Sequence, residues 1–123
     1  MSLEAHGFIG KVVKEIKGAE EHSDEILFIT ECGETRKMYH DQCCCESVFV
    51  TDVIGDVEDL IGEPILVYEE SCDSSSSPLD ERDYSYTWTF YKFATRKGWV
   101  DIRWYGTSNG YYSESVWFEK VED

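Results

Sequence analysis

Hydrophobic and polar positions alternate along much of this chain, and the alternation is clearest in its last third. Val100, Ile102 and Trp104 fall on one side of an extended segment, which we expect to face the core. Asp101 and Arg103 fall on the other, wetter side. Aromatic and β-branched residues, which favour a pleated and half-buried surface, dominate the region. The pattern predicts an antiparallel meander of three strands at residues 84–95, 99–105 and 111–118.

The turns of this meander each contain a glycine. Gly98 lies where a short hairpin loop needs a residue with positive φ, and Gly110 completes the Asn-Gly dipeptide of tight hairpins. A two-residue turn at 108–109 would set Arg103 opposite Glu114, a favourable cross-strand pair. A turn one residue later would shift the register by two and separate the pair. The pairing argument favours the first register, and the sequence leaves both open.

The rest of the chain predicts shorter strands, one helix and one loop. Asp56 suits the N-cap and Gly62 the position after the last helical residue, so a helix of one to two turns is expected near 57–61. Residues 71–83, rich in serine and acidic side chains, are expected to form a flexible loop. Further strands are expected at residues 8–16, 25–30, 35–40, 47–53 and 65–68.

Together these elements predict a single, mainly β domain over residues 1–123. About seven or eight antiparallel strands would form two meanders, the first within residues 8–40, arranged as a sandwich or a partly open barrel. The one short α-helix near 57–61 would be held by packing, because a helix of that length is marginal alone. The chain has neither a signal peptide nor an apolar run of membrane-spanning length, so we expect a cytoplasmic protein that contacts no membrane.

The net charge of −15 is concentrated in one part of the chain. Residues 41–83 carry one Lys or Arg against thirteen Asp or Glu. Direct binding of nucleic acid is disfavoured, because phosphate neutralisation requires clusters of basic residues. So acidic a surface favours a basic protein partner, and a DNA mimic with carboxylates in place of phosphates is the extreme form. A divalent cation and simple solubility are the alternatives.

Five cysteines, three of them consecutive at 43–45, do not form a disulfide framework, and reduced thiols are expected. Thiolates and imidazoles are the ligands that zinc prefers, although the spacing lacks the usual Cys-x2-Cys pair. The alternatives are that the cysteines are small buried hydrophobes, or that one is a nucleophile, which the surrounding acidity disfavours. The candidate zinc ligands are Cys32, His40, Cys43 and Cys45.

A candidate binding surface lies on the wetter side of the predicted meander. Exposed aromatic side chains mark binding surfaces, whereas the alternative is an aromatic-rich core. Trp99 and Trp117 both fall on the side opposite the expected core face, which is awkward for a sheet with one buried side. The candidate surface residues are Arg103, Tyr105, Tyr111 and Glu114.

A second acidic group surrounds the predicted helix, where carboxylates occur at close intervals. Calcium binding is one interpretation, but the spacing is not that of an EF-hand loop. A capped helix with a solvated face is the other interpretation, and we prefer it. The residues are Asp52, Asp56, Glu58, Asp59 and Glu63.

Several strings carry a family resemblance, and they span most of residues 25–119. They are Tyr39-His40-Asp41-Gln42, Asp52-Val53-Ile54-Gly55-Asp56, Tyr86-Thr87-Trp88-Thr89-Phe90-Tyr91-Lys92 and Ser108-Asn109-Gly110-Tyr111-Tyr112-Ser113. In these the chain is similar to a family of small phage and prophage proteins classed as a domain of unknown function. The resemblance implies a phage-accessory context in a bacterial cytoplasm, and it implies no activity or assigned site.

We therefore expect a non-enzymatic, phage-related interaction protein that presents an acidic face to a basic protein. The second hypothesis is a metal- or thiol-dependent site at residues 40–46. The third is an enzyme that acts on a small molecule in an aromatic pocket near Arg103 and Glu114, and it requires a concave site there.

Overall fold

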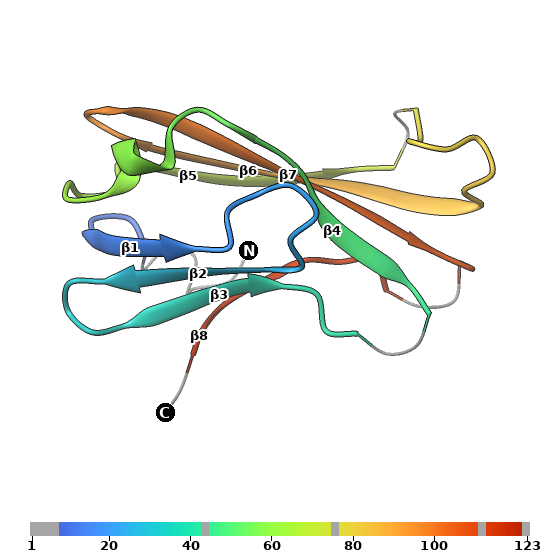
Figure 1. The fold of residues 1–123 in the computed structure, drawn as a ribbon, viewed down its shortest axis with the longest axis horizontal. Coiled ribbons are helices and arrows are strands. Elements are labelled where there is room, and N and C mark those ends of the chain that lie inside the picture. The colour runs from blue at the N-terminus through green and yellow to red at the C-terminus, as the bar shows by residue number, and fades with distance from the viewer. Residues whose placement is uncertain (1–7, 43–44, 75–76, 111–112, 122–123) are drawn as a thin grey trace.

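Eight strands form two antiparallel sheets that pack face to face in the computed structural model, which describes residues 8–42, 45–74, 77–110 and 113–121 (Figure 1). The mainly β fold is therefore confirmed, as a sandwich of two four-stranded sheets. The first sheet has the strand order β1-β2-β3-β8 and the second β4-β7-β6-β5. The strands are β1 (Val13–Lys17), β2 (Glu25–Thr30), β3 (Thr35–Tyr39), β4 (Ser47–Ile54), β5 (Val67–Asp73), β6 (Ser85–Thr95), β7 (Gly98–Ser108) and β8 (Trp117–Lys120).

The expected N-terminal meander is confirmed as β1, β2 and β3. Its first strand is shorter than predicted and begins at Val13. The chain before it turns, because Gly10 has a φ of 93° and the Lys11 N–H bonds to the carbonyl oxygen of Phe8. Phe8 is nevertheless fully buried, so it joins the core from the turn.

The second sheet is built around the long hairpin of β6 and β7. The two strands pair without interruption from Ser85–Ser108 to Thr95–Gly98. β5 pairs with β6 and β4 with β7, so the two long strands are central. Residues 71–73, expected in a loop, belong to β5 because they pair with β6 as far as Trp88. The expected core face of β7 is confirmed.

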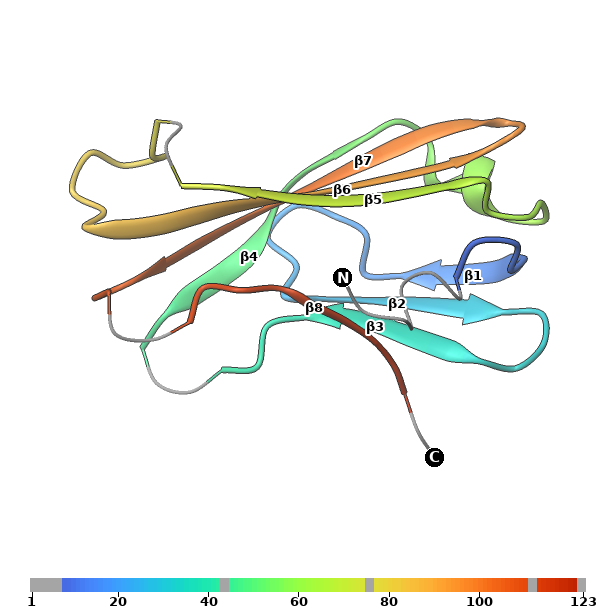
Figure 2. The same cartoon turned by 180° about the vertical axis from the view of Figure 1, so that it is seen from behind.

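The third strand predicted at 111–118 is found only at its end, as β8, and its predicted place in this meander is wrong; residues 111–112 lie outside the described residues. After β7 the chain leaves the second sheet and crosses to the first, where β8 pairs with β3 (Figure 2). Neither hairpin register therefore forms, and Arg103 does not lie opposite Glu114. The Glu114 carboxylate instead turns into the sandwich, where it accepts hydrogen bonds from Ser85, Thr87 and Ser108. These bonds hold the crossing segment at the end of the sandwich.

The short helix is confirmed in place but is a 3-10 helix, η1 (Val57–Leu60). One turn is all that fits between the Asp56 cap, which accepts the Glu58 N–H at 3.0 Å, and Gly62, whose φ is 88°. Gly98 does not have the positive φ expected of it. It leaves room for the Asp59 side chain, because a Cβ there would lie 2.6 Å from a carboxylate oxygen of Asp59.

The core fills the space between the two inner sheet faces. Phe8, Phe28, Phe93 and Phe118 meet there with ring centroids 5.2–6.0 Å apart, mostly edge to face. Such aromatic packing contributes beyond simple burial. Within the described residues, no helix is long and apolar enough to cross a membrane.

Candidate binding face

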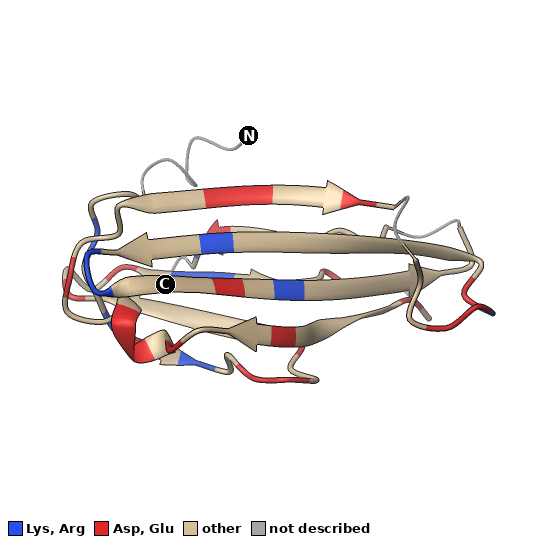
Figure 3. Ribbon diagram, turned by 90° about the horizontal axis from the view of Figure 1, so that it is seen from above, with Lys and Arg blue, Asp and Glu red and all other residues tan. Residues whose placement is uncertain are grey.

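The four strands of the second sheet lie side by side in the view from above (Figure 3). The outer face of that sheet carries three consecutive rows of side chains. Register fixes the rows, because residues paired across antiparallel strands point to the same side of the sheet. Of the three, the row nearest η1 is Glu69, Lys92, Asp101 and Ile54, the second is Ser71, Phe90, Arg103 and Asp52, and the third is Asp73, Trp88, Tyr105 and Phe49.

A hollow of about 350 Å³ lies between the first two rows. Side chains from all four strands of the sheet line it, so it runs across the sheet. Its lining includes Glu69, Ser71, Phe90, Lys92, Asp101 and Arg103. A smaller hollow of about 200 Å³ adjoins it on the side of Trp88 and shares Phe90 and Arg103 with it. The rings of Trp88 and Phe90 stack with an interplanar angle of 8°.

The two cations of the larger hollow are directed to groups of the protein itself. Arg103 Nη2 lies 3.1 Å from Asp52 Oδ2, and Lys92 Nζ lies 4.6 Å from the centroid of the Trp99 ring. Among the described residues, neither Glu69 nor Asp101 forms an ion pair, and the buried Nε of Arg103 has no acceptor. The hollow therefore contains two carboxylates and two cations, and both cations have partners within the protein.

Tyr105 lies on this outer face but is not available to a ligand. Its side chain is only 2% exposed, because residues 77–83 cover it. The hydroxyl donates to Asp83 Oδ2 at 2.6 Å and accepts the Leu79 N–H at 3.1 Å. Burial, together with the Asp83 carboxylate, raises the pKa of Tyr105 to about 12. The expectation that it belongs to a wet face is therefore wrong, and Tyr111 lies outside the described residues.

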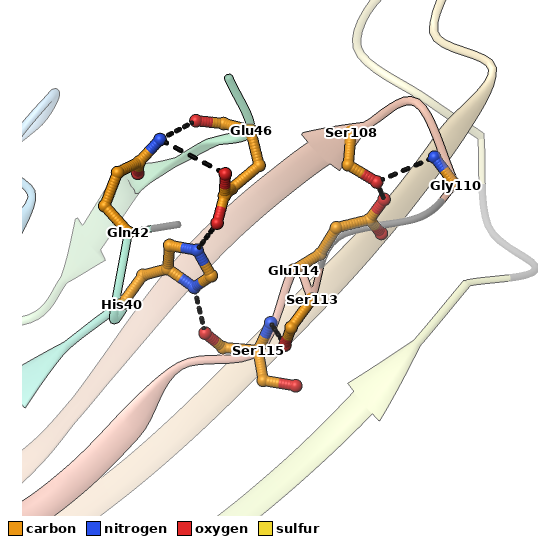
Figure 4. A network of polar contacts seen from close by, with 8 residues as sticks. All are labelled: His40, Gln42, Glu46, Ser108, Gly110, Ser113, Glu114 and Ser115. Atoms are coloured by element: carbon orange, nitrogen blue, oxygen red, sulfur yellow. Dashed lines mark hydrogen bonds and ion pairs between the residues drawn. The ribbon is translucent and has the colours of Figure 1, made fainter. Parts of the chain in front are cut away.

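Glu114 lies on the opposite side of the same sheet from Arg103. Ser85, Thr87 and Ser108 donate to its carboxylate at 2.6, 2.8 and 2.6 Å (the Ser108 contact is drawn in Figure 4). Three hydroxyl donors compensate the burial of a carboxylate that is 9% exposed. The structure therefore does not bring together the four residues of the predicted binding surface.

His40 and Glu46 form a buried pair beside the crossing segment (Figure 4). His40 Nε2 lies 2.8 Å from Glu46 Oε2, and Nδ1 lies 2.6 Å from the carbonyl oxygen of Ser115. Gln42 donates to the Glu46 carbonyl oxygen at 2.6 Å. Both ring nitrogens of His40 are thus engaged, and the imidazole joins the 40–46 loop to the chain that leads into β8.

The predicted zinc ligands are only partly brought together. Cys32 lies in the β2–β3 turn, at the other end of β3 from His40 (Figure 1). Cys45 is near His40 in sequence and exposed, and Cys43 lies outside the described residues. In the described ranges, no three His, Cys, Asp or Glu side chains are grouped to hold a metal ion. A zinc site at His40, Cys43 and Cys45 stays a prediction, and Cys32 lies apart from it.

The described cysteines are not the buried hydrophobes that the alternative interpretation expects, since Cys32, Cys45 and Cys72 are all exposed. The Thr30 hydroxyl, 3.2 Å from the Cys32 sulfur, lowers the pKa of that thiol, with smaller contributions from the Glu34 backbone and the Lys11 ammonium.

The acidic residues around η1 contact different partners. Asp56 caps the helix, Asp52 pairs with Arg103, and Glu63 pairs with Arg96 at 2.7 Å. This dispersal fits a capped helix with a solvated face, which is the interpretation preferred from the sequence.

Sequence reasoning missed Glu69, Phe90 and Asp101 as members of one hollow. The signal was present in residues 67–73, where an extended strand would put Glu69 and Ser71 on one face. It was lost because that strand was predicted to end at Tyr68.

Comparison with known proteins gives a family and no activity. The family model described as "Domain of unknown function (DUF7448)" matches residues 6–118. No match was found among the curated proteins or among the solved structures. Since the family model covers nearly the whole chain, this protein belongs to the DUF7448 family.

Proposed function

We propose that this protein is a non-enzymatic binding protein that presents an acidic surface to a basic protein. The observation that carries the proposal is the use of its own basic side chains. Lys11, Arg36 and Lys120 share the Glu34 carboxylate, and carboxylates remain in excess because 26 Asp and Glu stand against 11 Lys and Arg. Most of the basic side chains form ion pairs with carboxylates of the same chain. These are Lys11, Lys17, Arg36, Lys37, Arg82, Arg96, Arg103 and Lys120.

Two further lysines are also occupied. Lys97 donates to the carbonyl oxygens of Glu58 and Ile61, at 3.3 and 2.9 Å, and so supports the C-terminal end of η1. Lys92 lies over the ring of Trp99. With a net charge of −15, the protein therefore presents a negative potential that attracts basic partners and disfavours nucleic acid.

The edge strand β5 supports a role in binding. It is the outermost strand of the second sheet, and Glu69 and Glu70 at its centre are exposed. Acidic side chains on an exposed edge prevent pairing between copies of the same chain, because like charges repel. Glu69 and Glu70 would not repel a basic segment of another protein.

The resemblance to phage and prophage proteins supports a phage-accessory setting for this binding, in the cytoplasm of a bacterial host. A basic partner there is a host or phage protein, and a DNA-binding partner would make the protein a DNA mimic. Carboxylates would then occupy the positions that phosphates take in the partner's nucleic-acid site.

Capture from a bacterial lysate at two salt concentrations tests the proposal. We expect the immobilised protein to retain proteins of high isoelectric point at about 50 mM salt and to release them at about 500 mM, because salt screens charge attraction. Retention of the same proteins at both concentrations, or of proteins with no excess of basic residues, would contradict it.

A further inference from the structure

The edge strands of the two sheets differ in how far the chain covers them. β1 and β8 border the first sheet, and β4 and β5 border the second. On the side of β1 that faces away from its sheet, the Gly62 N–H donates to the carbonyl oxygen of Val13 at 2.9 Å. On the corresponding side of β4, Val50 forms two backbone hydrogen bonds with the β1–β2 loop, one with His22 and one with Ser23. Loops of the protein therefore occupy part of these two edges.

β5 is a longer edge that the fold leaves open. It has seven residues, whereas β8 has four. In the described part of the chain, no backbone group bonds to the side of β5 that faces away from β6 between Val67 and Cys72. Alternate residues of an antiparallel strand direct both their N–H and their C=O groups away from the neighbouring strand. β5 therefore offers a row of donors and acceptors on which one further strand can form.

The side chains at the centre of β5 determine which strand this edge accepts. Glu69 and Glu70 are consecutive and exposed, so their carboxylates lie on opposite faces of the sheet. Neither forms an ion pair with a described residue. Lys92 is the cross-strand neighbour of Glu69, but its ammonium lies 4.6 Å from the centroid of the Trp99 ring. The Glu70 carboxylate accepts the Tyr91 hydroxyl at 2.8 Å and keeps its charge. A strand added to β5 thus meets one carboxylate on each face.

We propose that β5 binds an extended segment of the basic partner as an additional strand of the second sheet. The segment carries two adjacent basic residues, because neighbouring side chains of a strand lie on opposite faces and so meet Glu69 and Glu70 one on each face. Backbone hydrogen bonds supply the affinity, and the charges select the segment. A second copy of β5 is rejected, because its own glutamates would repel these two. The inference rests on the proposed function and gives it a site and a partner conformation.

An NMR titration of the whole protein with a synthetic peptide tests the proposal. The peptide has alternating threonine and valine on both sides of a central Arg-Lys pair, and both of its ends are blocked. Amide shifts are expected at residues 67–73. At saturation, hydrogen exchange of the β5 amides that point away from β6 is expected to slow at least about tenfold, because the new strand protects them.

A second peptide, N-methylated at the two central residues, separates strand addition from charge attraction. It keeps both charges, but adjacent N–H groups point to opposite edges of a strand, so the methyl groups block both edges of the peptide. We expect it to bind at least about tenfold more weakly than the first peptide. Equal affinities of the two peptides would overturn the proposal.

Two charge-matched double variants of the protein locate the site. E69Q/E70Q removes the carboxylates at the centre of β5, and E20Q/E21Q removes two exposed carboxylates of the β1–β2 loop. Glutamine keeps the size of each side chain and an oxygen that accepts the Tyr91 hydroxyl. We expect the first variant to weaken peptide binding about fivefold and the second to leave it within about twofold. Equal weakening by both variants, or amide shifts centred on another strand, would overturn the site.

The lysate experiment distinguishes failure of this site from failure of the proposed function. Each of the contradicting results above leaves the proposed function standing if the protein still retains basic proteins in a salt-sensitive way. Loss of that retention, with the peptide still bound at β5, would instead overturn the proposed function.

Discussion

Arg103 and Asp52 face each other on neighbouring strands, β7 and β4, with Nη2 and Oδ2 3.1 Å apart. Both side chains are close to 40% exposed, at 40% and 39%. The pair turns the guanidinium toward the β4 edge of the sheet and leaves the carboxylate of Asp101, in the adjacent row, without that cation. The contact therefore helps to set the charge of the hollow beside it.

Asp52→Asn is expected to lower the free energy of unfolding by less than about 1 kcal/mol, because exposed ion pairs contribute little. Urea unfolding at about 50 mM and 500 mM salt measures the effect, which should shrink at the higher concentration. Glu63→Gln, which removes the carboxylate from the partly exposed pair with Arg96, is the matched control. A loss above about 2 kcal/mol would show that the pair has a structural role that its exposure does not predict.

Glu114→Gln is expected to cost about 1–3 kcal/mol of unfolding free energy, because the side chain loses a charged acceptor for three hydroxyl donors inside the protein. Urea unfolding of the variant provides the measurement. Glu119→Gln, on exposed β8, is the control and should change stability by less than about 0.5 kcal/mol. A Glu114 variant as stable as the wild type would contradict the assignment of this carboxylate as the anchor of the crossing segment.

Native mass spectrometry of protein purified without chelator tests the environment of His40. Both ring nitrogens are engaged, by Glu46 and by the Ser115 carbonyl, so we expect the native and denatured masses to agree. A stoichiometric zinc-sized difference, lost in His40→Asn, would show that zinc binding depends on His40. It would support the ligand set of His40, Cys43 and Cys45.

Alkaline pH is expected to destabilise the protein partly through Tyr105. Its folded pKa of about 12 lies above the ordinary value of about 10 for an unfolded chain. Below pH 10 the phenol is protonated in both states, so its contribution to stability is fully present. Between about pH 10 and 12 only the unfolded state loses the proton, and stability falls by up to about 1.4 kcal/mol per pH unit.

Urea unfolding across this pH range, compared with Tyr105→Phe, isolates the effect. The wild type should lose stability more steeply than the variant, which has no phenol to titrate at this position. Tyr68 and Tyr91, whose pKa values burial and the Glu70 carboxylate also raise, affect both proteins equally. Parallel pH profiles for the two proteins would show that Tyr105 ionises as readily in the folded state as in the unfolded chain.

The sequence predicts the mainly β fold because alternation reports directly on burial, and it leaves a sandwich and a partly open barrel as alternatives. Val100, Ile102 and Trp104 are fully buried as expected, and the three N-terminal strands pair as expected. The partner of the last strand was not predictable in this way. In the sequence, residues 113–115 are compatible with a strand that pairs with β7. In the structure, hydroxyls on the inner face of the second sheet donate hydrogen bonds to Glu114. The alternation of polar and apolar residues does not predict these long-range hydrogen bonds.

The candidate site was predicted only at Arg103. Tyr105 lies on the expected side of β7, yet the loop at 77–83 covers it, and loop packing leaves no periodic signal. Glu69 lies on β5 and Asp101 on β7, and these two strands are aligned only because each of them pairs with β6. Their grouping depends on long-range pairing, which the sequence does not fix.

Isothermal titration with a peptide of alternating arginine and serine is the most direct test of the account. Its central claim is that the acidic surface binds a basic protein. The affinity of the wild type for this peptide is expected to fall at least about tenfold between about 50 mM and 500 mM salt, because salt screens charge attraction. An affinity that does not change with salt, or no binding at about 50 mM salt, would contradict the claim.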